Sequence, residues 1–403
     1  MRIGVDAACW ANGRGYGRFT RELLGAMVTS SRHDEFVLFT DDPSAIDLTA
    51  SNVRVVTVPQ SVRSIDAASA DGARSALDML RFLRAVWREP VDVFFSPSVY
   101  TWFPLPPRCR AVVTIHDAIA DRYPELTLPS VRARLFWRAK VWLALRQARL
   151  VLTVSRFAAR EIAEVLHVAP ARLRVAGEAP AAAYRPASRD EIMAAAHAVG
   201  MPDGARWFTY VGGFNPHKRV DVLVRAHARL AAGIRAAGGT VPYLLLVGHR
   251  SGDVFHGAHR EIERAIESGG AGEFVRWTGF VPDEELRKLH SGARALVLPS
   301  MSEGFGLPAV EAAACGAPVI ATLSSPLPEL LQGGGVFVPP GDEDALLDAM
   351  RLLLDDGERT RMGERARLAT TALSWRAAAE AALGALREVT RGNAAAAVRE
   401  AVA

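Results

Sequence analysis

The stretch ALVLPSMSEGFGLPAVEAAACGAPVIA, residues 295–321, decides the fold of the chain's second half. It starts with an apolar run typical of a strand and passes through a glycine-containing loop. A helical pattern then begins near Leu307 or Pro308, and a second apolar run closes the stretch. A strand, a loop, a helix and another strand in this order predict a βαβ unit of a parallel sheet, whose ligand-binding loops follow the carboxyl ends of the strands.

Two carboxylates lie in this unit, Glu303 in the loop and Glu311 in the first turns of the helix. An acidic residue at a nucleotide site can accept hydrogen bonds from both hydroxyls of a ribose, which we predict for Glu311. Glu303 would meet a sugar hydroxyl or a hydroxyl close to a phosphate. Gly304 and Gly306 would expose backbone N–H groups at the helix start, where a pyrophosphate binds. In the alternative, both carboxylates lie on the surface, favoured there by the helix dipole.

Short β-branched runs alternate with amphipathic stretches on both sides of this unit, which is typical of parallel sheets covered by helices. The predicted strands are residues 2–6, 35–40, 53–58, 91–96, 111–116 and 150–155 in the first half and residues 207–211, 243–247, 274–277, 295–299 and 318–321 in the second. The segment GEAPAAAYRPAS, residues 177–188, breaks this alternation with prolines and small residues. We therefore predict two domains, residues 1–185 and 186–374, and a helical C-terminal segment, residues 375–403, with a frayed end.

The composition indicates a globular protein of two or three domains, because 50% of the 403 residues are hydrophobic and 23% are charged. Cys9, Cys109 and Cys315 lie far apart and outside any Cys/His cluster, so neither a disulfide framework nor a zinc site is indicated. The sequence starts with a strand pattern rather than a leader, and no window is long and apolar enough for a membrane-spanning helix. We expect a soluble protein in the cytoplasm.

The formal net charge of +4 and the isoelectric point of about 9.2 weakly favour an anionic ligand or a membrane surface. Nucleic acid is not expected as a partner, because the basic residues alternate with acidic ones and no aromatic-basic repeat occurs. The stretch SVRARLFWRAKVWLALRQAR, residues 130–149, has six basic residues, three large aromatic residues and no acid. Such a helix can lie on anionic lipid. We favour the alternative that its apolar residues are core and its arginines reach the solvent.

Two loops of the first half carry candidate site residues. Residues 12–23, NGRGYGRFTREL, place Gly15 and Gly17 before a predicted helix, so that backbone N–H groups can approach a phosphate or a sugar. His116 and Asp117 stand where another strand ends, a position that faces a ligand site. In the alternative, the loop is a plain connector, a backbone carbonyl satisfies the histidine and the aspartate caps a helix.

A third loop lies in the second half. Residues 207–226, WFTYVGGFNPHKRVDVLVRA, present a strand, then Gly212 and Gly213, and then Lys218 and Arg219 at the start of a helix. Two cations beside a helix N-terminus suit a diphosphate, because the dipole and the charges stabilise the same anion. The alternative is a solvated basic turn.

These motifs resemble those of the retaining glycosyltransferases of family 4, and the resemblance extends over nearly the whole chain. The block EGFGLPAVEAAACGAPVIA resembles the E-x7-E motif of that family, with Glu303 and Glu311 at its ends. Other similar segments are GFVPDEELRKLHSGARALVLPS, SSPLPELL, TIHDAIADRYPE, LTVSRFAAREI and LSWRAAAEAALGALREV. The resemblance implies an α/β protein with the GT-B fold, in which two Rossmann-like doubly wound domains face a central cleft and the C-terminal helix returns to the first domain.

The resemblance also implies roles for individual residues. In the first, acceptor-binding domain, His116 would contact the transferred sugar, Gly15 and Gly17 would lie near the donor phosphate and the acceptor, and Tyr16 and Asp117 would lie on the acceptor side. In the second, donor-binding domain, Lys218 would neutralise the diphosphate, Glu303 would bind sugar hydroxyls and Glu311 would hold the ribose. Further donor-site residues are Gly212, Gly213, Arg219, Gly304, Phe305, Gly306 and Leu307, of which Phe305, Gly306 and Leu307 would offer backbone N–H groups.

One position departs from the family pattern. Many members carry an arginine in the turn where this sequence has Gly213, so half of the usual pair of cations is missing. Arg219 is a candidate substitute, although its side chain would leave a helix about 100° around the axis from that of Lys218.

The residues favour a reaction without a metal ion or another cofactor. Cleavage of a sugar-diphosphate bond places negative charge on the leaving phosphate, which Lys218, the helix dipole and backbone N–H groups can stabilise. No Asp-x-Asp follows a predicted strand of the second half, and the pair Asp41-Asp42 follows a strand of the first half, where we favour a turn role. Relatives react on a single face of the sugar without an evident carboxylate nucleophile. The leaving phosphate would then deprotonate the acceptor, and neither Asp117 nor Glu303 is assigned as a nucleophile.

We expect transfer of a hexosyl group, with mannosyl as the first candidate, from a GDP- or UDP-linked sugar to a hydroxyl of a glycan or of a lipid-linked acceptor at the inner membrane. The segment TIHDAIADRYPE resembles bacterial mannosyl- and hexosyltransferases of surface polysaccharide assembly. Two alternatives remain. A GT-B-like epimerase would form its product without an acceptor, and a noncatalytic nucleotide-sugar-binding subunit would bind a donor without turnover.

Overall fold

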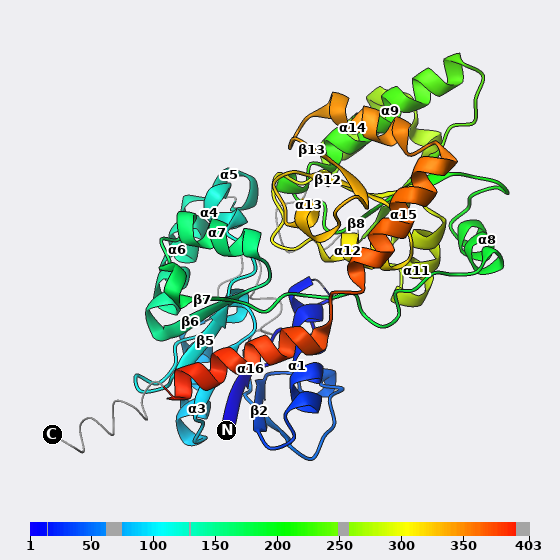
Figure 1. Ribbon diagram of the computed structural model, residues 1–403. Helices are drawn as coiled ribbons and strands as arrows, with labels where there is room; N and C mark the ends of the chain where they lie inside the picture. Colours follow the sequence, from blue (N-terminus) through cyan, green and yellow to red (C-terminus); the bar gives the residue numbers. More distant parts are fainter. Residues whose placement is uncertain (14, 62–74, 129, 249–257, 392–403) are drawn as a thin grey trace. The chain divides into compact units, whose positions relative to one another are not determined.

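The computed structural model describes residues 1–13, 15–61, 75–128, 130–248 and 258–391. The chain forms two compact units, Met1–Glu178 together with Trp375–Ala403, and Ala179–Ser374. Each unit is built on one parallel sheet with helices packed against it (Figure 1). This confirms the predicted class of two parallel α/β domains. The predicted frayed end, residues 392–403, lies outside the described residues.

The first unit has a seven-stranded parallel sheet in the order β3-β2-β1-β4-β5-β6-β7. Its strands are β1 (Arg2–Asp6), β2 (Glu35–Thr40), β3 (Val53–Thr57), β4 (Val93–Ser96), β5 (Ala111–Thr114), β6 (Ala148–Thr153) and β7 (Leu173–Val175). Its longer helices are α1 (Gly15–Ser30), α3 (Ala76–Arg88), α6 (Val131–Gln147), α7 (Arg156–Val165) and α16 (Trp375–Arg391). The strand order reverses between β1 and β4, which creates the switch point where doubly wound sheets bind ligands.

The second unit has a six-stranded parallel sheet in the order β10-β9-β8-β11-β12-β13. Its strands are β8 (Trp207–Val211), β9 (Tyr243–Val247), β10 (Val275–Gly279), β11 (Leu296–Leu298), β12 (Val319–Thr322) and β13 (Gly335–Val338). Its longer helices are α8 (Arg189–Ala198), α9 (Val220–Ala236), α10 (His259–Gly269), α11 (Asp283–Gly292), α12 (Leu307–Ala314), α14 (Glu343–Leu352) and α15 (Asp356–Thr370). The order reverses between β8 and β11, so the Gly-Gly turn and the loop that carries Glu303 both follow strands at the switch point.

The chain passes from the first unit to the second between Glu178 and Ala179, ahead of the boundary predicted after residue 185. The residues in between pack on the second unit. Tyr184 is buried there, and its hydroxyl group donates a hydrogen bond to Asp283 over 3.0 Å. The prolines and small residues that indicated a linker therefore belong to a segment held by one large aromatic side chain.

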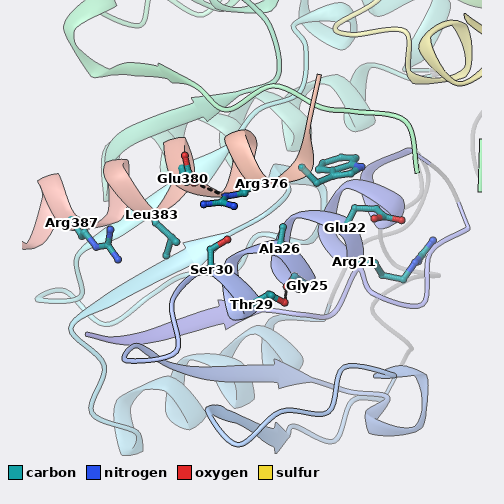
Figure 2. A pocket seen from close by; sticks show the side chains of 11 residues that line it. Arg21, Glu22, Gly25, Ala26, Thr29, Ser30, Arg376, Glu380, Leu383 and Arg387 are labelled. Atoms are coloured by element: carbon teal, nitrogen blue, oxygen red, sulfur yellow. Dashed lines mark hydrogen bonds and ion pairs between the residues drawn. The ribbon is translucent and has the colours of Figure 1, made fainter. Parts of the chain in front are cut away.

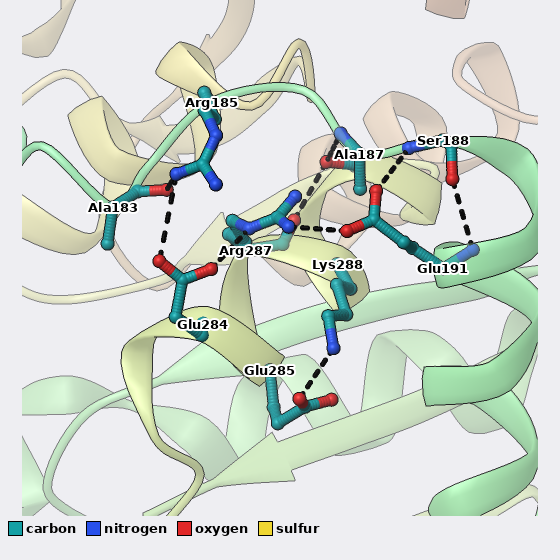
Figure 3. A network of polar contacts seen from close by, with 10 residues as sticks. Ala183, Arg185, Ala187, Ser188, Glu191, Glu284, Glu285, Arg287 and Lys288 are labelled. Carbon is teal, nitrogen blue, oxygen red and sulfur yellow. Dashed lines mark hydrogen bonds and ion pairs between the residues drawn. The ribbon is translucent and has the colours of Figure 1, made fainter.

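The start of α8 is held by a polar network. Ser188 and Glu191 form a capping box at the helix N-terminus. The guanidinium group of Arg287, on α11, lies 2.6 Å from Glu191 and 2.8 Å from Glu284, so it joins the two helices (Figure 3). Arg287 itself is almost fully buried, and these two carboxylates satisfy its charge.

Helix α16, the last described element of the chain, is part of the first unit. It packs along α1, as the red and blue ribbons of Figure 1 show. Arg387 contacts Asp34 over 3.2 Å, and Arg174 forms a two-pronged ion pair with Glu388. The ring of Trp375 packs edge-on against Phe19 of α1. The first unit is therefore assembled from the two ends of the chain.

The basic stretch of residues 130–149 differs in part from the expectation of a core helix. Trp137, Val141 and Ala144 of α6 are buried, as expected. Five other apolar side chains are exposed instead: Val131, Leu135, Phe136, Trp142 and Leu143. The buried residues lie on the side of α6 that packs against the sheet. The exposed apolar residues lie on the other side, among the arginines. Within the described residues, no helix is both long and apolar enough to cross a bilayer.

Candidate functional site

The loop between β11 and α12 ends in an open helix N-terminus. Gly306 precedes α12 with φ 85°, and a Cβ atom there would lie 2.9 Å from Leu327, so only glycine fits without a shift of the core. No side chain caps α12. Among the described residues, the backbone N–H groups of Phe305, Gly306 and Leu307 have no hydrogen-bond acceptor. These groups and the helix dipole together favour an anion.

Lys218 and Glu303 lie together beside this loop. The Lys218 Nζ atom is 2.7 Å from Glu303 Oε1, and the hydroxyl group of the buried Ser300 donates to the same oxygen over 2.6 Å. Both charged side chains are largely buried, with 22% and 12% of the lysine and glutamate side chains exposed. Sequence reasoning missed Ser300. The alternative of a surface Glu303 is wrong, and so is a solvated Lys218, because both side chains are largely buried and form an ion pair.

The turn that carries Lys218 differs from the expected helix start. Pro216 begins a 3-10 turn, Pro216–Lys218, and Arg219 follows with a left-handed φ of 50° before α9 starts at Val220. The backbone N–H group of Met301 donates to the carbonyl oxygen of His217 over 2.8 Å, which ties this turn to the Glu303 loop. The two cations therefore lie ahead of the helix rather than in its first turn.

The side chain of Arg219 runs along the same loop. Its Nε atom is 3.4 Å from Asp221 and its Nη1 atom is 3.7 Å from the sulfur of Met301. Asp221 thus offsets part of its charge. Gly213 accepts a hydrogen bond from the hydroxyl group of Tyr210. A Cβ atom at Gly248 would lie 2.3 Å from the carbonyl oxygen of Gly212, so the turns after β8 and β9 are in close contact.

Glu311 is buried in α12, with 3% of the residue exposed. The surface alternative is therefore wrong for this carboxylate as well. Burial, together with the negative charge of Glu311, raises the pKa of the Cys315 thiol to about 12. Cys9, Cys109 and Cys315 are free thiols. Glu311 is therefore a buried carboxylate in the first turns of α12.

An Asp-x-Asp does follow a strand of the second unit, contrary to the sequence reading, because β13 was missed. Asp342 caps α14 through the N–H group of Ala345, and Asp344 forms an ion pair with Arg229. In the first unit, Asp42 accepts from the N–H group of Ser44, which confirms the expected turn role. No three His, Cys, Asp or Glu side chains come together as metal ligands would in the part of the chain that the structure describes. Metal independence stays a prediction.

The glycine loop of the first unit is closed by Gly17. A Cβ atom at this position would lie 2.0 Å from the carbonyl oxygen of Asn12, whereas at Gly15 it would meet nothing within 4 Å. The ring of Tyr16 stacks on Tyr100, with 5.4 Å between centroids. Gly17 therefore has a packing reason to be glycine, and Gly15 has none.

His116 and Asp117 follow β5, which ends two residues earlier than predicted. The Nε2 atom of His116 lies 3.0 Å from the carbonyl oxygen of Pro97 and therefore carries the proton, and Asp117 accepts from the N–H group of Ile119 over 2.9 Å. The backbone carbonyl that the alternative expected for His116 is thus present, whereas the N-cap of the next helix, Ile119–Arg122, is Ala118 rather than Asp117. The contact with Pro97 leaves the Nδ1 edge of His116 as the side that faces another group.

That group is Glu178, which sequence reasoning missed. Its Oε1 atom is 3.7 Å from His116 Nδ1, and both side chains are nearly buried. Glu178 stands in the segment, residues 177–188, that predicted the domain boundary. The available signal was an acidic residue among small residues and prolines.

An open pocket also lies in the first unit, between α1 and α16 (Figure 2). Charged side chains of both signs line it, among them Arg21 and Glu22 from α1 and Arg376 and Glu380 from α16. None of the predicted site residues is among the described residues that line it. We therefore assign the site to the loops at the sheet edges.

Two family models match the chain, one in each unit. The model described as "Glycosyltransferase Family 4" matches residues 13–177, and the model described as "Glycosyl transferases group 1" matches residues 194–369. The chain belongs to the group 1 glycosyltransferases of family 4. This confirms the resemblance, and the matched regions contain His116 in the first unit and both Glu303 and Glu311 in the second.

Two curated relatives of the glycosyltransferase match different fractions of its chain. It is 29% identical over 378 residues to the O-antigen chain mannosyltransferase B of Escherichia coli, a match that covers 90% of this chain and 92% of the relative. It is 37% identical over 204 residues to the D-inositol 3-phosphate glycosyltransferase of Nocardia farcinica, which covers 50% of this chain and 44% of that protein.

Solved structures share the fold of the glycosyltransferase. Sucrose-phosphate synthase from Thermosynechococcus elongatus has a TM-score of 0.74 at 21% identity, with 97% of this chain and 99% of that chain covered. WaaG, a glycosyltransferase involved in lipopolysaccharide biosynthesis, has a TM-score of 0.71 at 15% identity, and HepE of Anabaena in complex with UDP and glucose has 0.70 at 17%; both matches cover 96% of this chain and 99% of the other. The fold is therefore GT-B.

Proposed function

We propose that the protein is a retaining hexosyltransferase that uses a nucleotide diphosphate sugar as donor and a hydroxyl of a glycan or lipid-linked molecule as acceptor. The observation that carries the proposal is the Lys218–Glu303 pair beside the open N-terminus of α12. HepE, a structural neighbour, binds UDP-glucose, which supports a nucleotide-sugar donor. GDP-mannose is the first donor to test, because the relative matched over 92% of its length is a mannosyltransferase.

The donor would bind by exchange of ion-pair partners. In the ligand-free protein Lys218 neutralises Glu303. A diphosphate that accepts from Lys218 and from the N–H groups of Phe305, Gly306 and Leu307 would release Glu303 to accept hydrogen bonds from sugar hydroxyls. Glu311 would hold the ribose, and Arg219, partly neutralised by Asp221, would supplement Lys218.

The chemical step would need no metal ion. The bond between the anomeric carbon and the phosphate oxygen breaks, and the acceptor oxygen forms its bond to the same face of that carbon. The acceptor proton moves to the departing phosphate oxygen, so the charges balance. Lys218 and the N-terminus of α12 stabilise the negative charge that develops on the diphosphate. We propose that His116, held by Pro97 and Glu178, contacts the transferred sugar.

The test is a thermal-shift and turnover screen against GDP-mannose, GDP-fucose, UDP-glucose, UDP-galactose, UDP-GlcNAc and dTDP-rhamnose, with EDTA present. We expect one donor to raise the unfolding temperature of wild type and not that of Glu311→Gln. Lys218→Ala should lower kcat about 10²- to 10³-fold, the usual loss for one electrostatic stabiliser of a transition state. Matched controls are Glu358→Gln on α15 and Lys288→Ala on α11, each of which removes one partner of an ion pair elsewhere in the same unit.

Each outcome decides between the candidates. Turnover that disappears with EDTA and returns with a divalent cation would reject metal independence. Product formed from the donor without any acceptor would favour an epimerase. Binding without turnover would favour a noncatalytic subunit, for which the glycine at position 213 already argues. No response to any donor or to free nucleoside diphosphates would reject the proposal.

A further inference from the structure

Helices α3 and α6 of the first unit expose an unusual number of apolar side chains. More than half of the large apolar residues that are exposed in the described part of the chain lie on these two helices. They are Leu77, Leu80 and Trp87 on α3, and Val131, Leu135, Phe136, Trp142 and Leu143 on α6. Single exposed apolar residues are normal on a protein surface, but a group of this kind marks an interaction surface.

On α6 the exposed apolar residues form a stripe. Val131, Leu135 and Trp142 recur at i, i+4 and i+11, which places them within about 40° of one another around the helix. Trp142 and Leu135 are 56% and 63% exposed. Arg138 and Arg146 flank the stripe, and the guanidinium group of Arg146 lies 4.9 Å from the ring centroid of Trp142. The sequence of α6 contains no acidic residue.

Helix α3 repeats the pattern. Leu80 and Trp87 lie two turns apart on one side, Trp87 is 67% exposed, and Arg84 lies between them. The opposite side, which includes Phe82, is buried. The one acidic residue of this helix, Asp78, is buried and forms an ion pair with Arg81. The exposed side of α3 is therefore also apolar and basic.

The two helices cover the same face of the sheet. The crossovers from β3 to β4 and from β5 to β6 run in the same direction along the strand order, and right-handed crossovers then place α3 and α6 on one face. The segment between β4 and β5 contacts both helices. Phe103 stacks on Phe82 of α3, and Lys140 of α6 donates to the carbonyl oxygen of Tyr100 over 3.1 Å. The two stripes therefore belong to one composite surface.

We propose that this surface, formed by the exposed sides of α3 and α6, docks the protein onto a bilayer that contains anionic lipid. The apolar stripes would enter the boundary between headgroups and acyl chains, where tryptophan is favoured, and the arginines would contact lipid phosphates. Charge complementarity selects this occupant. A second copy of the same surface would bring two basic, acid-free faces together, which costs electrostatic free energy. The proposal does not depend on which donor the enzyme uses.

The experiment is co-sedimentation of the full chain with phosphatidylcholine vesicles that either contain or lack phosphatidylglycerol. We expect binding to the anionic vesicles that weakens as salt is raised. Arg138→Glu/Arg146→Glu should weaken it at least about tenfold, since each basic residue near an anionic surface contributes about a factor of five. Leu135→Ser/Trp142→Ser should weaken binding at every salt concentration.

Matched controls carry the same changes in the second unit. Arg264→Glu/Arg367→Glu alters the charge equally, and Leu352→Ser/Leu368→Ser removes exposed apolar residues there. Both controls should bind like wild type. Absence of wild-type binding to anionic vesicles, or equal binding by wild type and both α6 variants, overturns the proposal. So does a wild-type dimer in size-exclusion chromatography that the α6 variants lack, because the surface then joins two copies. Should the Leu135/Trp142 variant fail to fold in thermal unfolding, the arginine variant decides.

Discussion

At Gly17 the absence of a side chain is a packing requirement, whereas at Gly15 it is not. Both residues lie in the first turn of α1, and both would be read from the sequence as parts of one glycine-rich loop. The carbonyl oxygen of Asn12 occupies the place where a Cβ atom of Gly17 would be. At Gly15 that place is open. The structure thus separates a glycine that closes a loop from one that leaves room for a ligand.

The two positions make a matched pair for mutation. Gly17→Ala should destabilise the first unit by several kcal/mol, on the order of 3, because a backbone oxygen must move in a packed loop. Gly15→Ala should leave stability unchanged or slightly higher, since alanine favours a helix, and it should lower transfer activity if a phosphate or sugar approaches there. Urea unfolding and steady-state kinetics on both variants check this. Equal destabilisation by the two substitutions would contradict the packing argument.

Residue-scale features that depend on distant contacts could not be predicted. Glu303 and Glu311 were identified because strand, loop and helix follow one another in the sequence. The pairing of Glu303 with Lys218 and that of His116 with Glu178 need tertiary structure to be found. The left-handed Arg219 is set by a turn that Pro216 starts and that the Glu303 loop holds through Met301. No local sequence pattern predicts such a contact.

Among the elements, α16 is the one that completes the first unit. It packs along α1 and also contacts β4, β5, β6 and β7. Its buried side consists of Ala378, Ala379, Ala382, Leu383, Ala385 and Leu386. Small residues let the helix approach closely, so its few large side chains contribute most of the apolar area that it buries.

Leu386→Ala should therefore destabilise the first unit selectively. Leu386 is fully buried, and truncation of such a leucine typically costs about 2–5 kcal/mol. Hydrogen exchange measured by mass spectrometry should show faster exchange in peptides from β4 and β5 and unchanged exchange in peptides from β8 and β9. Leu368→Ala, at an exposed position of α15, is the control and should change neither set. Faster exchange in both units would show that α16 is not specific to the first.

Most elements could be predicted because β-branched runs and amphipathic stretches alternate with few exceptions. The two missed strands, β7 and β13, have three and four residues, too few for a periodic pattern. β13 consists of GVFV and directly follows two further glycines, which indicate a loop. Because β13 was not predicted, the Asp-x-Asp at the start of α14 was not recognised as following a strand. Strand pairing with β12 supplies the stability that the local sequence lacks.

At the scale of the whole molecule, buried histidines set the response to acid. His290 in the second unit has no exposed surface, and burial lowers its pKa from 6.5 to about 3. Burial and the nearby Lys218 lower the pKa of His217 to about 3 as well. Both stay neutral in the folded protein and take up a proton when it unfolds. Their contribution to stability is complete above about pH 6.5 and is lost progressively as the pH falls towards 3.

We expect His290 alone to reduce the free energy of unfolding by about 2 kcal/mol between pH 7 and pH 5. Urea unfolding of the protein across this range checks the slope. In His290→Asn the loss between pH 7 and pH 5 should be smaller by about 2 kcal/mol, because one proton fewer is taken up on unfolding, even though the variant is less stable at pH 7. An unchanged slope in the variant would show that His290 does not take up the proton.

The path of the chain through the two units has a consequence for its synthesis. The chain leaves the first unit after Glu178 and returns to it only at Trp375. On a ribosome, which makes the chain from its N-terminus, every strand of the first unit emerges long before α16 does, so its sheet must wait with part of one face uncovered. The second unit, although it starts later, has all of its residues first. The second unit can therefore finish folding before the first. A chaperone would bind a nascent chain at the apolar face of the first unit that α16 has yet to cover.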